Sequence, residues 1–303
     1  MKSDLAGTLL VAVCAFFWGI SGISVQILFS RSDISTGQII AIRLLISGIL
    51  LFLYCAAKYG KGVFDVWKSR RDAVDILLFS VMGTFAVQYT FFAAIKASDS
   101  ATASVLQYTY PVLVTLWVSL SAKKAPDKIQ AISIFLAVSG TFLITTGGRF
   151  SSLAISGEAA AWGLTSSVCI AFYTVHSKRI IGKFGTWRCH CWGLLLGGIV
   201  TLILVPSSRE LPHFDGVSVL LSAVIIILGT LLPFGMYLAG VQKIGGIKAG
   251  ALASIETFTV TVISVAFLGK RLTPAMVLGM LCITATVILP AIVNRKSQHS
   301  GTN

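Results

Sequence analysis

Charged residues are scarce in this sequence. Only 12% of its 303 residues are charged, 55% are hydrophobic, and the mean hydropathy is +0.88, whereas about a quarter of the residues in soluble domains are charged. Long polar segments are lacking too, since the longest connection between apolar runs is Lys58 to Asp72. An ordinary water-soluble protein is therefore excluded, and no soluble catalytic or ligand-binding domain is predicted.

The regular cysteine spacing of a disulfide-rich protein is also absent. The six cysteines are scattered, and four lie well inside apolar runs, where they act as small apolar side chains. Cys189, His190 and Cys191 are adjacent, but neighbours on a helix point in different directions and no second ligand pair follows. The sequence predicts no disulfide framework, no metal site and no cofactor.

Acidic residues are few, 11 against 24 Lys and Arg, which gives a formal net charge of +13. Such a charge can attract nucleic acid. Here, however, the basic residues lie mainly in short segments between apolar runs, and no basic face of a folded domain is predicted. Membrane topology explains this charge, and no nucleic-acid partner is expected.

The apolar residues form runs of about 20, the length that crosses a bilayer core. The first run, Leu5 to Phe29, is longer than the apolar part of a signal peptide and lacks a clear cleavage site, so we interpret it as a retained helix. An all-α integral membrane protein with ten transmembrane helices is predicted. The ten helices are expected near residues 5–29, 34–57, 73–95, 98–121, 127–147, 157–181, 185–205, 216–242, 247–268 and 273–293.

Basic residues alternate between the two sides of these spans. With the amino terminus inside, the cytoplasmic segments hold 17 Lys and Arg residues and the outer loops hold six, with Arg43 inside the second helix. Because short cytoplasmic loops retain Lys and Arg, both termini are predicted to be cytoplasmic. The protein is expected in the cell (inner) membrane as a multi-pass protein.

Similar features recur at half the chain length. Residues 7–30 and 157–180 both open with Gly, and residues 101–127 correspond to 247–274 at an offset of 146 to 147. Each of the latter pair runs from small residues through an apolar helix to a basic pair and a proline: Lys123-Lys124 and Pro126, and Lys270-Arg271 and Pro274. Because five helices is an odd number, the second copy must be inverted, a plan typical of secondary transporters with a solute site where the repeats meet.

The chain contains several short motifs in the order in which they occur in a known family. They are Trp18-Gly19, Ile42 to Leu45, Ala101 to Pro111, Ala171 to Thr174, Ala249 to Thr257, Leu268-Gly269 and Leu272 to Pro274. With them the chain resembles the ten-helix EamA-type members of the drug/metabolite transporter superfamily over nearly its whole length.

The resemblance implies solute transport by alternating access through a central cavity, with amino acids and related metabolites as common cargo and a proton or solute gradient as the energy source. It also implies one five-helix repeat in residues 1–150, a second in 151–296, and a short polar tail in 297–303. The chain departs from the family in carrying Lys123 and Lys270 where a Glu often ends the fourth and ninth helices. This departure puts in doubt any ion pair that those glutamates would form, but it does not put the fold in doubt.

Two charged residues lie clearly inside predicted helices, Arg43 and Glu256. Charges at membrane depth are costly and usually face the protein interior. Glu256 lies near the midplane, where burial favours the protonated acid; it is a candidate for proton coupling, for a counter-charge to a cationic group, or for packing. Arg43 could bind a carboxylate, or lock the second helix to a neighbour, which is the interpretation we favour.

Polar and aromatic residues form stripes on other predicted helices. His176, near the cytoplasmic end of the sixth helix, could relay protons, although its basic neighbours favour an interfacial role. Pro111 should kink the fourth helix and is a candidate hinge. Candidates for lining the cavity, which could equally bond helix to helix, are Trp18, Gln88, Tyr89, Gln107, Tyr108, Trp162, Tyr173 and Tyr237.

The sequence thus predicts a secondary transporter that exports a small organic solute, an amino acid or related metabolite, through a cavity lined by helices 1, 3, 4, 6, 8 and 9. Its expected partners are that solute and membrane lipid, with protons as the candidate coupling ion. Uptake of a small amine or metabolite is the alternative. A membrane-embedded enzyme would need convergent catalytic groups, and a sensor would need an output domain; neither pattern is present.

Overall fold

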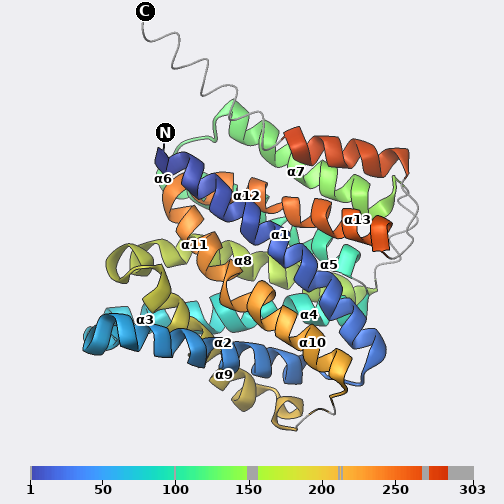
Figure 1. Cartoon of the computed structure of the whole chain (residues 1–303). Coiled ribbons are helices and arrows are strands. Elements are labelled where there is room, and N and C mark those ends of the chain that lie inside the picture. Colours follow the sequence, from blue (N-terminus) through green and yellow to red (C-terminus); the bar gives the residue numbers. More distant parts are fainter. Residues whose placement is uncertain are drawn as a thin grey trace, which may run out of the picture.

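The computed structural model describes residues 2–98, 100–148, 156–210, 212, 214–267 and 273–285. Within these ranges the regular elements are helices, with no strand. Figure 1 shows the helices packed side by side as one bundle.

The described residues of the first half form nine helical segments. They are α1 (Lys2–Arg31), α2 (Thr36–Tyr59), η1 (Gly60–Trp67), α3 (Arg70–Leu78), η2 (Phe79–Ala86), α4 (Val87–Ala97), α5 (Ser100–Gln107), α6 (Tyr110–Ala122) and α7 (Lys128–Thr146).

The second half repeats this order with few differences. Its segments are α8 (Gly157–Phe184), α9 (Thr186–Leu204), η4 (Pro206–Arg209), α10 (Gly216–Ile226), η5 (Ile227–Leu231), α11 (Pro233–Ile244), α12 (Gly246–Ala253), α13 (Ile255–Phe267) and a last helix, Pro274–Ala285.

Each of the ten predicted ranges contains helix. Seven stretches are long and apolar enough to cross a membrane: Asp4–Arg31, Thr36–Trp67, Arg70–Ala97, Thr102–Ala122, Thr186–Leu204, Gly216–Ile244 and Gly246–Ile263. The apolar parts of α7 and of the last helix are shorter, and α8 is not among the seven. The count of ten spans with both termini inside therefore stays a prediction. Arg149, Leu268, Gly269, Lys270, Arg271, Leu272, residues 286–296 and the predicted tail lie outside the described residues.

Two kinds of interruption occur once in each half. η2 and η5 are π-helical segments within otherwise α-helical stretches, and both contain a Gly-Thr pair, Gly83-Thr84 and Gly229-Thr230. A turn at Tyr108–Thr109 separates α5 from α6, directly before Pro111, and Ser254 separates α12 from α13. The kink predicted from Pro111 is present, and Ser254 lies 146 residues after Tyr108, the offset found in the sequence.

The opening helix of each half packs against the other half. α1 packs mainly on α11 and α13, and α8 packs mainly on α4, with further contacts to η2 and α6. Figure 1 shows α1 lying across the orange segments of the second half. This exchange brings the interruptions of both halves to the centre of the bundle.

Glycines allow the closest helix crossings. α2 and α9 form the most extensive contact in the bundle; a methyl group on Gly48 would lie 2.8 Å from the backbone nitrogen of Leu195, and one on Gly198 would lie 3.1 Å from that of Leu45. Helices in lipid associate through such small residues because their backbones can approach closely. The glycines thus fix how the two halves meet at this edge.

An ion-pair cluster joins the halves at the predicted cytoplasmic end. Asp72 on α3 is 2% exposed and accepts bonds from Arg179 (2.9 Å) and Lys183 (2.5 Å) on α8. Arg179 also bonds Asp75. These two acids of the first half therefore hold the basic end of α8.

We predict that Gly48→Ala weakens the bundle, because the new methyl group meets backbone rather than a flexible side chain. Overpacking of this kind costs about 1–3 kcal/mol. The thermal midpoint of the purified protein in detergent should fall. The matched control is Gly182→Ala on α8, where a methyl group meets nothing within 4 Å; an equal loss in both variants would contradict the crossing as the cause.

Candidate functional site

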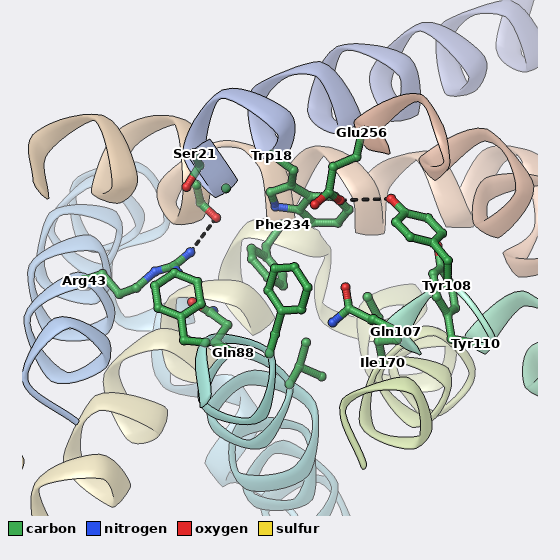
Figure 2. A pocket seen from close by; sticks show the side chains of 15 residues that line it. Trp18, Ser21, Arg43, Gln88, Gln107, Tyr108, Tyr110, Ile170, Phe234 and Glu256 are labelled. Carbon is green, nitrogen blue, oxygen red and sulfur yellow. Dashed lines mark hydrogen bonds between the residues drawn. The ribbon is translucent and has the colours of Figure 1, made fainter. Parts of the chain in front are cut away.

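A cavity lies among the helix interruptions at the centre of the bundle (Figure 2). Its volume is about 40 Å³, room for a few water molecules and small beside the roughly 300–1,000 Å³ of most ligand pockets. The cavity is therefore narrow. The lining residues are Trp18, Ser21, Gly22, Arg43, Val87, Gln88, Phe91, Phe92, Gln107, Tyr108, Tyr110, Ile170, Gly229, Phe234 and Glu256.

The breaks in the fourth and ninth predicted helices face each other and are bonded together. The Tyr108 hydroxyl lies 2.5 Å from the Ala253 carbonyl and 2.9 Å from Glu256 Oε2. Tyr110 donates to the Gly250 carbonyl at 3.3 Å. A broken helix leaves backbone carbonyls without partners, and these tyrosines supply donors from the other half.

Glu256 follows the Ser254 break and is only 5% exposed. Its bonded partner is Tyr108, shown as a dashed line in Figure 2. Within the described part of the chain no Lys, Arg or His lies at ion-pair distance from this carboxyl. A carboxyl in this position can hold a proton or a cationic group of a solute.

Arg43 on α2 is 2% exposed and reaches η5. Its Nε donates to Thr230 Oγ1 at 2.6 Å and its Nη2 to the Gly229 carbonyl at 2.8 Å, and its guanidinium lies 4.3 Å from the centroid of the Phe92 ring. These bonds join α2 to η5, and the locking role of Arg43 stays a prediction. The side chain also lines the cavity, and its Nη1 has no partner among the described residues.

The cavity wall thus holds one buried cation and one buried acid. Figure 2 places Arg43 and Glu256 on opposite sides of the cavity. Among the described residues, neither forms an ion pair with the other or with a third residue. Because an unpaired buried charge is costly, the arrangement suits a ligand that carries both signs of charge.

Two neutral groups of the wall also lack partners. Trp18 Nε1, Gln88 Nε2 and Gln88 Oε1 are buried without a hydrogen bond. Each such group costs about 1–3 kcal/mol relative to a satisfied one. The cavity wall therefore contains several polar groups that a bound solute could satisfy.

Six of the predicted site residues lie together at this cavity. They are Trp18, Arg43, Gln88, Gln107, Tyr108 and Glu256. Gln107 donates from Nε2 to Ser166 Oγ at 2.6 Å, so part of its amide is used in packing α5 on α8.

The other six lie elsewhere. Tyr89 and Trp162 pack on each other, with ring centroids 5.8 Å apart. Tyr173 and Tyr237 are fully buried: Tyr173 packs against Phe234 (5.8 Å), and the Tyr237 hydroxyl lies 3.1 Å from that of Thr174. His176 lies at the charged end of α8, 3.9 Å from Asp75, and Pro111 begins α6.

Nine of the residues that line the cavity, and one of the helices that line it, were not predicted from the sequence. α2 was not expected to line the cavity, yet Arg43 places it there. The Gly-Thr pair common to both π segments is a signal that could have indicated Gly229. The missed residues are Ser21, Gly22, Val87, Phe91, Phe92, Tyr110, Ile170, Gly229 and Phe234.

Comparison with known proteins identifies the family. The sequence model of the EamA-like transporter family matches residues 5–146 and again 158–291, so the chain belongs to this family. It is 36% identical over 304 residues to an uncharacterized inner membrane transporter, YicL, of Salmonella typhimurium, covering 99% of this chain and 100% of that protein. It is 26% identical to the threonine/homoserine exporter RhtA of Escherichia coli K12, covering 84% and 82% of the two chains.

A solved crystal structure has the same fold, with a TM-score of 0.73 at 15% identity and 97% of each chain covered. The protein is thus a multi-pass transporter of the cell membrane for a small-molecule solute, not an enzyme. These findings confirm the predicted family, the prediction that the protein is a transporter and not an enzyme, and the predicted localisation in the cell membrane.

We predict that Tyr108→Phe destabilises the protein by about 1–3 kcal/mol, because the Ala253 carbonyl and the Glu256 carboxyl both lose a buried donor. Thermal unfolding in detergent measures the loss. Tyr54→Phe is the control, since the Tyr54 hydroxyl bonds only the exposed Lys58 among the described residues. Unchanged stability of Tyr108→Phe would show that these bonds contribute little.

Proposed function

We propose that this member of the EamA-like transporter family exports a small zwitterionic solute of the amino-acid class. The observation that carries the proposal is the pair of buried ionisable groups, Arg43 and Glu256, which line one central cavity and have no ion-pair partner among the described residues. An amino acid offers a carboxylate to the first and an ammonium group to the second.

The binding groups suit these roles. Arg43 is held by Thr230 and Gly229, which leaves its Nη1 free for a carboxylate oxygen, and charge-assisted bonds of this kind are among the stronger ones. Glu256 keeps one oxygen beyond the one bonded by Tyr108. The rings of Trp18, Phe91 and Phe234 would enclose the carbon part of the solute.

Similarity to RhtA, a threonine/homoserine exporter, over most of the chain favours export over uptake. The opposite direction, uptake, uses the same cavity, and measurement of flux decides between them.

Transport would proceed by alternating access between two inverted five-helix repeats, residues 1–150 and 151–296, with both termini in the cytoplasm. Two matches of one family model, the paired π segments and the paired helix breaks support this plan. The narrow cavity fits an occluded stage of the cycle, in which the wall has closed at the centre.

Glu256 would couple transport to protons. The solute's ammonium group needs the ionised carboxyl, whereas the protonated carboxyl remains neutral after the solute has left. A proton entering from outside would therefore replace the departing solute, and acid outside the cell should accelerate export.

Flux measurements in proteoliposomes test the function. Purified protein should move radiolabelled amino acids faster than amines or sugars of similar size, and loaded cells that express it should release amino acid faster than cells that do not. Turnover of a lipid substrate with no solute flux would refute the proposal.

We predict that Arg43→Lys lowers amino-acid flux about tenfold or more, because an ammonium group cannot hold η5 and a carboxylate together as the guanidinium fork does. Arg209→Lys is the matched control, since Arg209 also bonds backbone carbonyls (Leu202 and Ile203) but is exposed and outside the cavity. Normal flux in Arg43→Lys would remove Arg43 from the binding site.

We predict that Glu256→Gln abolishes the acceleration of export by an inward proton gradient, because the amide cannot titrate. Flux is measured at several outer pH values in liposomes of wild type, Glu256→Gln and the control Glu158→Gln, whose carboxylate is exposed at the start of α8. Wild-type pH dependence in Glu256→Gln would leave Glu256 as a packing or binding residue.

A further inference from the structure

We propose that Gln88 determines solute specificity, and that its carboxamide recognises an uncharged hydrogen-bonding group, such as a hydroxyl, on the side chain of the solute. The inference rests on the proposed function and goes beyond it, because the charged pair recognises only the part that all amino acids share.

Gln88 is buried at the cavity, with an exposed fraction of 2%. Within the described part of the chain, neither its Nε2 nor its Oε1 has a hydrogen-bond partner. Neighbouring wall positions on the same helix, Val87, Phe91 and Phe92, are apolar. A neutral donor and acceptor set in an apolar wall is a costly arrangement, and a ligand that bonds both atoms would relieve that cost.

The π segment explains why Gln88 faces the cavity. η2 ends at Ala86, two residues before Gln88, and π segments shift the register of the following helix and are frequent at functional sites. In the second half, Phe234 lies 146 residues later, shortly after η5, and also lines the cavity. The corresponding positions therefore carry an amide on one wall and an apolar ring on the other.

The chemistry of the amide selects the ligand. A carboxamide donates and accepts at once, as does a hydroxyl group, so the two can pair in either direction. The fixed charges of a zwitterion are better matched by Arg43 and Glu256. The other glutamine of the wall, Gln107, is already bonded to Ser166, which leaves Gln88 as the glutamine with both polar atoms free among the described lining residues.

The experiment compares threonine with valine, which differ by a hydroxyl in place of a methyl group. Sites that bond a substrate hydroxyl reject the analogue that lacks it. Wild-type protein in proteoliposomes should therefore move threonine about tenfold faster than valine at equal low concentration. In Gln88→Met, which keeps the length but not the bonds, the two rates should differ by no more than about twofold, mainly through slower threonine flux.

Gln242→Met is the matched control, because Gln242 is exposed on α11, outside the cavity; it should keep the wild-type ratio. Folding of Gln88→Met is checked by its thermal midpoint, which should not fall because the lost amide had no partner. Equal wild-type rates for threonine and valine, or an equal loss of both in Gln88→Met, would overturn this inference while leaving amino-acid transport intact. No flux of either would overturn the proposed function and this inference with it.

Discussion

Backbone groups inside a bilayer cannot bond to water, so every interruption of a membrane helix must be satisfied by the protein itself. This chain interrupts four of its long helical stretches, at η2, Tyr108–Thr109, η5 and Ser254. The partners are local and specific: Tyr108 and Tyr110 donate to carbonyls beside the Ser254 break, and Arg43 donates to Gly229 in η5. These residues meet at the central cavity, which is the candidate functional site.

The same bonds place charge at the centre of an apolar bundle. Arg43 bonds η5, and Tyr108 links one break to Glu256. Arg43 uses Nε and Nη2 in these bonds, and its Nη1 has no partner among the described residues. Glu256 keeps one carboxyl oxygen beyond the one bonded by Tyr108. The same side chains therefore hold the helix breaks and line the cavity.

Helix exchange between the halves places the cavity where the two halves meet. α1 packs on helices of the second half and α8 on helices of the first, while Gly48 and Gly198 hold α2 against α9. Asp72 and Asp75 join α3 to α8 at one end only. If one half rocked against the other, the ion pairs between α3 and α8 would break or form, while α2 and α9 would stay in contact at Gly48 and Gly198.

Hydrophobic runs and basic loops indicated a multi-pass membrane protein and its helical stretches, because run length and charge position are properties of sequence alone. The family was indicated by its resemblance in the ordered motifs from Trp18-Gly19 to Leu272–Pro274. The sequence also marked Arg43 and Glu256, since charges at membrane depth are rare. It could not decide which faces of the helices meet. Tyr89, Trp162, Tyr173 and Tyr237 matched the pattern of Gln88 and Tyr108, yet they do not line the cavity: Tyr89 packs on Trp162, and Tyr173 packs behind the lining residue Phe234. Only the tertiary structure settled this, because the π segments change helix register and the contacts between halves choose the inner face.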